Sequence, residues 1–291
     1  MKVLGVLWLG FLRICQANAN KLASGYTSKK DMVLRFCLFF DIAATFFSFL
    51  YLFAVGFNGF NLITLLCSVV MGMTFVLEVT SMLECVKSAP LVLCNICAMG
   101  GGIIAPTIMG TLFYGDSMKT IQWLGVALFF LSVYMFSSKQ NNKKLSVKTL
   151  LFLLLNFLAN SVCGIVNQFF AEKVVGGNPS VFSFLSYFSA AIITTILIIF
   201  SLKKPTLRLG VLKLPRRALI LGGALGIICS TLLYFNTVLI RMVPIVIVNT
   251  IPSIISIVGC FVLGLIFFGE KLTFKNIIGV IFGALAAVLL V

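Results

Sequence analysis

The fold is decided by a stretch of sequence that occurs twice, as KSAPLVLCNICAMGGGIIAPTIMGTLFYGDSMKTIQWLG at residues 87–125 and as RMVPIVIVNTIPSIISIVGCFVLGLIFFGEKLTFKNIIG at residues 241–279. In each copy a long apolar run is followed by a short turn of glycine and an acidic residue, and then by a second apolar run. Seven positions agree in residue or in charge at a constant spacing of 154 residues, which identifies an internal repeat. The matched pairs are Lys87 and Arg241, Pro90 and Pro244, Asn95 and Asn249, Gly110 and Gly264, Gly115 and Gly269, Asp116 and Glu270, and Gly125 and Gly279.

The repeat extends beyond this stretch, to a glycine pair at the same spacing and to a segment near the N-terminus at a spacing of 152 residues. The sequence therefore predicts two halves, residues 1–140 and 145–291, joined by a polar segment at 139–146. The additional matches are Gly72 with Gly226, and four positions of Gln16–Gly25 with Gln168–Gly177.

The composition places the chain in a membrane. Hydrophobic residues make up 61% of the sequence, charged residues only 10%, and the mean hydropathy is +1.17. A soluble domain carries about 25% charged residues. In lipid every backbone polar group must be paired internally, and continuous apolar runs of about 20 residues select helices. We predict an all-α integral membrane protein of ten transmembrane helices, five per half, at residues 3–20, 33–56, 61–83, 88–113, 119–138, 147–170, 179–202, 217–239, 243–268 and 274–291.

The basic residues predict an orientation. Of the 22 Lys and Arg residues, 17 lie in the loops on one side of the ten spans, four lie on the other side, and Arg13 lies within a span. Loops rich in Lys and Arg stay in the cytoplasm, so both termini are predicted to lie outside a plasma (inner) membrane. Halves of five spans each then insert in opposite senses, as in many secondary transporters. The net charge of +15 is explained by these loops facing anionic headgroups, so no nucleic-acid partner is expected.

A secretory signal is an alternative interpretation of the first span, because Met1 and Lys2 precede an apolar run and a small-residue site at 17–19. Arg13 inside that run, and the partner of this segment in the second half, favour a transmembrane helix instead.

Catalytic and metal-binding motifs are nearly absent. The chain has no histidine, which excludes a Ser-His-Asp triad and a His-Glu zinc site. Its nine cysteines include one isolated C-x-x-C, Cys94 to Cys97, and small buried thiols are the favoured interpretation. We therefore expect no enzyme, no catalytic residue, no metal and no cofactor.

Polar residues within the spans are the candidates for a site, because such groups are costly in lipid and tend to face an interior cavity. For Asn95 and Asn249 a bond to a neighbouring helix is an equally good role. The predicted substrate-binding residues are Asn95, Asn249, Asn160, Tyr187, Tyr234 and Asn236, and the predicted ion-coupling residues are Arg13, Asp41 and Glu78.

Two roles are open for the three charged residues. One is a structural ion pair between Arg13 and Asp41. In the other, the surplus carboxylate, Glu78, binds a proton that is exchanged during transport, because desolvation favours the neutral form of a carboxyl group. That hypothesis predicts that Glu78→Gln abolishes proton-driven accumulation and leaves substrate exchange largely intact. The matched Asp116 and Glu270 are expected to cap the helices that follow their turns.

The two turns and the helices after them resemble the tandem EamA-type repeats of the drug/metabolite transporter superfamily. The pieces are GDSMKTIQWLG at 115–125 and GEKLTFKNIIG at 269–279, each with a glycine ten positions after that of the turn. The likeness implies a ten-helix basket with a central cavity, for substrates that range over amino acids, other metabolites, drugs and nucleotide sugars. Asp116 stands where glutamate is usual, and many relatives have cytoplasmic termini, opposite to the charge count.

The sequence and this resemblance together predict a secondary active transporter, by resemblance an exporter, of small polar metabolites such as amino acids or related compounds. A nucleotide-sugar or drug transporter of the same fold is the alternative within the class. A non-transporting membrane scaffold or lipid-handling protein is the alternative of another class. The expected partners are a small-molecule substrate and membrane lipids, and a homodimer is a further possible assembly.

Overall fold

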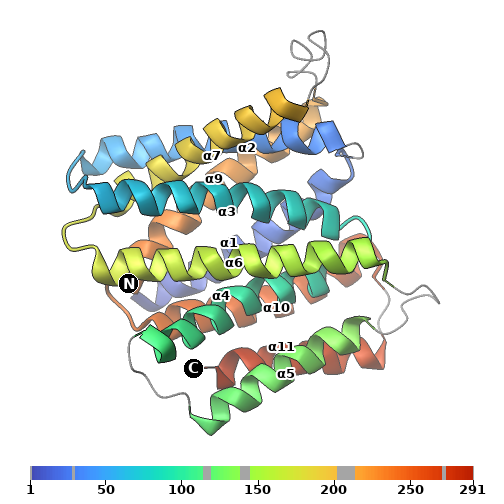
Figure 1. The fold of residues 1–291 in the computed structure, drawn as a ribbon. Coiled ribbons are helices and arrows are strands. Elements are labelled where there is room, and N and C mark those ends of the chain that lie inside the picture. Colours follow the sequence, from blue (N-terminus) through green and yellow to red (C-terminus); the bar gives the residue numbers. More distant parts are fainter. Residues whose placement is uncertain are drawn as a thin grey trace.

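The regular structure of this protein is α-helical. The computed structural model describes residues 2–27, 30–113, 119–137, 145–201, 214–270 and 273–290, and these hold ten helices and no strand (Figure 1). The predicted all-α class is confirmed, and the predicted spans agree with the helices to within four residues. The turn at 114–118 with Asp116, and most of the loops predicted at 139–148 and 203–217, lie outside the described residues. The helices are α1 (Lys2–Ser24), α2 (Lys30–Val55), α3 (Leu62–Cys85), α4 (Leu91–Phe113), α5 (Thr120–Ser137), α6 (Val147–Lys173), α7 (Pro179–Ser201), α9 (Arg216–Ile240), α10 (Ile245–Phe268) and α11 (Phe274–Leu289).

Side-chain caps define several helix ends. Asn61, Ser146 and Thr273 precede α3, α6 and α11, and each accepts a hydrogen bond from the backbone N–H three residues later. Such caps satisfy an N–H group that has no partner within its helix. At the other end of α10, Gly269 adopts a left-handed conformation with φ of 60°, which ends the helix and is favourable for glycine.

Seven of the helices are long and apolar enough to cross a membrane, which indicates a multi-pass membrane protein. They are α2, α3, α4, α6, α7, α9 and α10. Large apolar side chains cover the exterior, and Phe53 and Phe200 are each 82% exposed. An apolar exterior of this extent is suited to lipid. Of the remaining helices, α1 carries Arg13 among its apolar residues, and α5 and α11 have shorter apolar segments.

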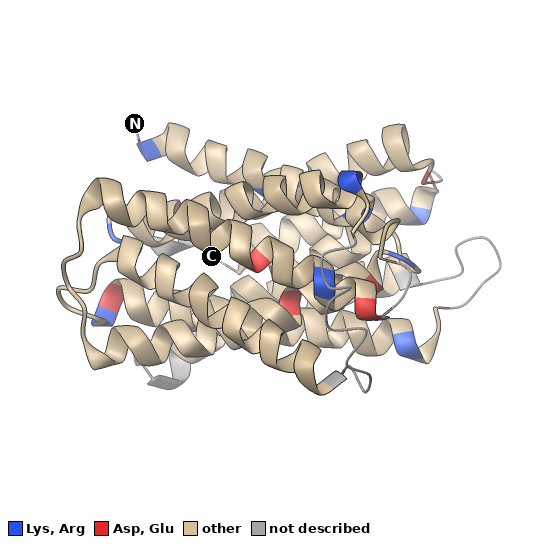
Figure 2. Cartoon of the chain, turned by 90° about the horizontal axis from the view of Figure 1, so that it is seen from above, with Lys and Arg blue, Asp and Glu red and all other residues tan. Residues whose placement is uncertain are grey.

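The helices lie side by side, with their connections gathered at two ends (Figure 1). End A, on the left in Figure 1, holds residues 55–62, 173–179 and 240–245 and both chain termini. Among the described residues, end B, on the right, holds 24–27, 85–91, 214–216 and 268–270. Charged residues lie mainly at the two ends and few lie between them (Figure 2).

Helices of the two halves correspond in position and in contacts. The bounds of α9, α10 and α11 begin 154 residues after those of α3, α4 and α5. The main contacts also correspond when the two halves are interchanged: α1 packs on α9 and α10, and α6 packs on α3 and α4. Likewise α2 packs on α9 while α7 packs on α3, and α2 with α7, α4 with α10 and α5 with α11 meet directly.

Matched glycines make matched contacts. A Cβ atom added at Gly125 would lie 3.1 Å from Leu289 Cβ, and one at Gly279 would lie 3.4 Å from Met135 Cβ, two positions that are themselves 154 residues apart. Another pair, Gly72 and Gly226, repeats this on other helices. Gly72 faces Ser189 and Ala190 of α7, and Gly226 faces Ala43 and Ala44 of α2. Small residues allow helix backbones to approach closely in lipid, so these glycines fix how the halves meet.

This packing predicts opposite effects for two glycines of α9. In Gly226→Ala the new Cβ would lie 2.7 Å from Ala43 Cβ and 2.8 Å from the Ala44 backbone nitrogen, neither of which can move freely. We expect a loss of about 1–3 kcal/mol, measured as a lower unfolding temperature in detergent. Gly223→Ala is the matched control, because its Cβ would meet no atom within 4 Å. It should be neutral or up to about 1 kcal/mol more stable. Equal effects would contradict the packing.

Candidate functional site

A cavity of about 140 Å³ lies inside the bundle. Residues of eight helices line it, from every described helix except α5 and α11. Both halves contribute, so the cavity exists only when the halves are together. Its polar lining consists mainly of Arg13, Gln16, Glu78, Asn160, Asn167, Tyr187, Asn236 and Asn249.

Arg13 of α1 brings a positive charge to this cavity. Its Nη1 atom donates to Ser253 Oγ at 3.0 Å and contacts Met99 Sδ at 3.2 Å. Met99 and Ser253 are matched positions of α4 and α10, 154 residues apart, so the guanidinium lies where these two helices meet. Nε and Nη2, which carry three more N–H groups, make no hydrogen bond to another side chain or carbonyl that the structure describes.

Glu78 of α3 brings the opposite charge. The thiol of Cys163 lies 3.9 Å from its Oε2 atom and 3.2 Å from Thr74 Oγ1. A sulfur at that distance is a weak partner for a carboxylate that can accept about four hydrogen bonds. Glu78 and Arg13 attract each other electrostatically across the cavity. The proton-binding role expected of Glu78 stays a prediction.

Four of the six predicted substrate-binding residues line the cavity: Asn160, Tyr187, Asn236 and Asn249. The Oδ1 atom of Asn236 is buried and has no hydrogen-bond partner in the described part of the chain. A buried acceptor without a partner costs about 1–3 kcal/mol in this conformation. Tyr187 stacks on Phe75, with ring centroids 4.8 Å apart, and the two rings form an aromatic part of the lining.

Two predicted substrate-binding residues do not line the cavity. Asn95 is 3% exposed and its Nδ2 donates to Ser256 Oγ at 3.0 Å, so it joins α4 to α10. Its matched partner Asn249 does line the cavity, which means that the two asparagines are not equivalent. Tyr234 stacks on Tyr51 of α2 with ring centroids 4.9 Å apart. Both side chains pack against a neighbouring helix in this conformation, and their role in substrate binding stays a prediction.

The predicted ion pair between Arg13 and Asp41 is wrong. Asp41 is 1% exposed, and its Oδ2 accepts a hydrogen bond from Thr194 Oγ1 at 2.7 Å, between α2 and α7. Arg13 bonds to Ser253 instead. Asp41 is not among the lining residues, so of the three predicted ion-coupling residues only Arg13 and Glu78 share the cavity.

The predicted site residues leave out part of the lining. Gln16 and Asn167 are polar residues within helices, and that property was a signal for both. No comparable signal marks Phe40 or Phe75, because the chain contains 29 phenylalanines and most of them pack elsewhere.

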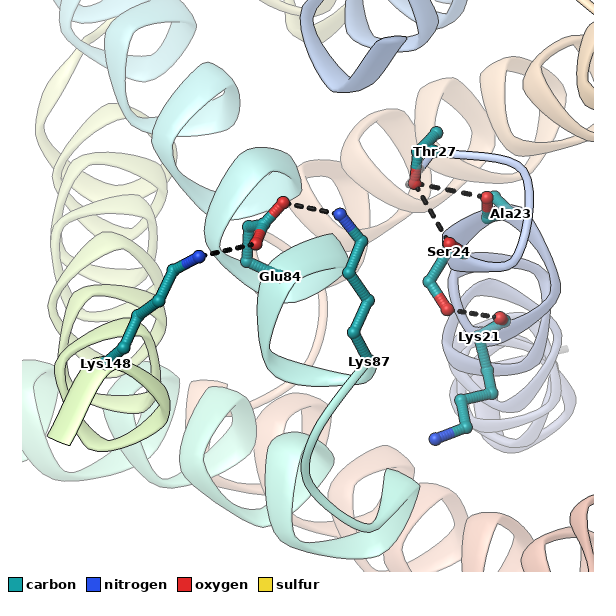
Figure 3. A network of polar contacts seen from close by, with 7 residues as sticks. All are labelled: Lys21, Ala23, Ser24, Thr27, Glu84, Lys87 and Lys148. Atoms are coloured by element: carbon teal, nitrogen blue, oxygen red, sulfur yellow. Dashed lines mark hydrogen bonds and ion pairs between the residues drawn. The ribbon is translucent and has the colours of Figure 1, made fainter. Parts of the chain in front are cut away.

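The cavity is closed toward end B. Leu91 to Ala98, the first two turns of α4, are all buried there. Ser88 and Thr149 hydrogen-bond across the halves, with their hydroxyl oxygens 2.8 Å apart. At the surface Lys87 and Lys148 point at Glu84 from two sides, and Lys148 Nζ lies 3.8 Å from its carboxylate (Figure 3).

Glu270 adds a further link at end B. Its Oε1 accepts a hydrogen bond from the Leu91 N–H at 2.7 Å, so it caps the N-terminus of α4 in the other half. The expectation that Glu270 caps the helix after its own turn is wrong, since Thr273 caps α11. Burial raises the pKa of the Glu270 carboxyl, although the Leu91 N–H and the charge of Lys21 act in the opposite direction. Lys21 in turn donates to the carbonyl of Val86, which fixes the turn before α4.

The cavity approaches end A more closely. Asn249 lies four residues after the start of α10 and Asn236 four residues before the end of α9, or about 6 Å at 1.5 Å per residue. On the other side the nearest lining residue is Val79, six residues or about 9 Å from the end of α3, and Ala98 lies seven residues from the start of α4. The start of α10 is also less buried than that of α4, since Ile247 is 40% exposed.

Thiol labelling tests this asymmetry. In a variant whose nine cysteines are replaced, Asn236→Cys should react with a small water-soluble thiol reagent, because Asn236 lines the cavity near end A. Ala89→Cys at end B should react far more slowly, because Ala89 is 5% exposed beneath the closed end. Equal rates in the folded protein would contradict a cavity closed at end B.

Comparisons with known proteins give the fold and no more. No protein-family model matches the chain, and no curated protein matches it significantly. Among solved structures 28 chains match, and one of them is described only as "Crystal structure of protein". That chain has a TM-score of 0.67 and 14% sequence identity, and the match covers 98% of this chain and 96% of the other. The similarity at this identity concerns the arrangement of the helices.

Proposed function

We propose that this protein is a secondary transporter of small polar metabolites. The observation that carries the proposal is the cavity of about 140 Å³ between the halves, with Arg13, Glu78 and several amides on its wall. Charged groups in the middle of an apolar bundle are costly and are retained mainly where they serve a ligand or ion pathway. An asymmetric closure, tight at end B and thin at end A, is what one state of an alternating-access cycle requires.

The proposal includes two inverted repeats of five helices each. All ten helices cross the membrane, including α1, α5 and α11. Support comes from the matched helix bounds, the exchanged helix contacts and the glycine pairs. The charge count of the loops favours end B as the cytoplasmic end and the termini at the outer face of a plasma membrane. Export, as the direction of transport, rests on the resemblance to EamA-type proteins.

The alternatives receive less support from the cavity. A nucleotide sugar carries phosphate charges that need several cations, and Arg13 is the lone cationic side chain among the residues that line the cavity. A scaffold or a lipid-handling protein would not need a cavity that holds both a carboxylate and a guanidinium.

Counterflow in proteoliposomes is the direct test of transport. Vesicles that contain the purified protein and an unlabelled metabolite panel inside should take up a labelled member of that panel transiently above its external concentration. Gly279→Leu is a suitable negative control, because a Cβ there already lies 2.6 Å from Phe136 Cε2 and a larger side chain would separate α5 from α11. Protein-free vesicles give the background. Uptake no greater than that background across the panel would reject the proposal.

Topology gives a second test. Val175 is 92% exposed at end A, and Arg217 lies at the start of α9 at end B. In a cysteine-free background, Val175→Cys should be labelled in intact cells by a membrane-impermeant thiol reagent. Arg217→Cys should be labelled only after the cells are permeabilised. The reverse pattern would overturn the proposed orientation and leave the fold unaffected.

A further inference from the structure

The two charges of the cavity have unused binding capacity. Arg13 uses only Nη1 for its bonds to Met99 and Ser253, which leaves the face of Nε and Nη2 for a ligand. In the described part of the chain, the only hydrogen-bond partner of the Glu78 carboxylate is the thiol of Cys163, at 3.9 Å. Neither group is neutralised by a direct partner of opposite charge.

Arg13 and Glu78 do not neutralise each other by contact. Among the described side chains, no nitrogen of Arg13 lies within 4.0 Å of a Glu78 oxygen. Their mutual attraction nevertheless acts across the cavity. Each of the two separated charges is costly to bury without a partner. A ligand that carries the complementary charges at its own two ends offsets both costs, because each end forms a charge-assisted hydrogen bond with one of the side chains.

The size of the cavity limits this ligand. An apolar cavity of about 150 Å³ holds a benzene-sized molecule. The cavity here, about 140 Å³, therefore takes a molecule of similarly few non-hydrogen atoms. The rings of Phe75 and Tyr187 offer an apolar wall for a short side chain.

We propose that the cavity binds a small zwitterion, an amino acid with a short side chain or none, whose carboxylate lies on Arg13 and whose ammonium lies on Glu78. This assignment rests on the proposed transport function and specifies its substrate class. A planar guanidinium can hold a carboxylate through two parallel hydrogen bonds. A dianion would have one uncompensated charge, and a cation without a carboxylate would be repelled by Arg13.

Ligand binding to the purified full-length protein tests the charge complementarity. The probes are glycine, L-alanine, β-alanine and γ-aminobutyrate, which vary the separation of the two charges. Propionate and ethylamine are the alanine analogues that lack the ammonium or the carboxylate. At least one zwitterion should bind, as measured by calorimetry. Loss of either charged group should weaken binding roughly 10- to 100-fold.

Two variants assign each charge to its partner. Glu78→Gln should weaken zwitterion binding by a similar factor and should not weaken propionate binding, because it removes a like charge. Arg13→Gln should weaken zwitterion binding in the same way and should not weaken ethylamine binding. If the effect of removing a charged group from the ligand and the effect of a variant on affinity are not additive, that ligand group and that side chain are in contact. Glu84→Gln is the matched control, because Glu84 is on the same helix but at the surface of end B.

Several outcomes would overturn the assignment. One is the absence of zwitterion binding, and another is equal affinity for alanine and both analogues. A third is a Glu78→Gln variant that still exchanges zwitterions and loses only proton-driven accumulation. The ligand comparison on the unaltered protein decides the question even if a variant does not fold. Counterflow is measured on the same preparation, so zwitterion binding without counterflow would reject transport alone. Counterflow of another metabolite without zwitterion binding would reject the zwitterion alone.

Discussion

The guanidinium of Arg13 within an otherwise apolar bundle is the constraint on which the rest of the structure depends. A charge at the centre of a bilayer costs about 2.5–3.5 kcal/mol on insertion scales, so the surrounding helices must compensate it. They do so with Ser253 and Met99, at matched positions of α4 and α10, and with the opposite charge of Glu78 across the cavity. A polar interior space between the halves is the consequence.

The cavity also depends on close packing elsewhere. Gly72 and Gly226 bring α3 and α9 against α7 and α2, and Gly125 and Gly279 join α5 to α11. These close backbone contacts hold the bundle together, and side chains of eight helices enclose the space around Arg13. Hydrogen bonds link the halves at both ends. Glu270 and Ser88 do so at end B, and at end A Lys2 Nζ donates to the Met242 carbonyl at 3.1 Å and Asn178 Nδ2 to the Gly56 carbonyl at 3.3 Å.

Much of this architecture could be predicted from the sequence, because apolar runs between polar turns determine helices in lipid and the spacing of 154 residues pairs them. The direction in which a side chain points could not be predicted. The residues of α4 are apolar on every face of the helix, so its sequence pattern did not show that Asn95 faces Ser256 of α10. Asp41 was assigned to the cavity by its charge alone, and only the packing of α2 on α7 places it against Thr194. Asn236 and Asn249 do line the cavity.

The central claim is that the bundle alternates between a state closed at end B and one closed at end A. Pulsed electron resonance between paired spin labels measures this directly, with one pair at Val175 and Met242 of end A and the other at Leu22 and Ser88 of end B, all at exposed positions. The account predicts that a transported substrate shifts the two distance distributions in opposite senses, one lengthening as the other shortens. Two distributions that stay fixed, or that lengthen and shorten together, would contradict it.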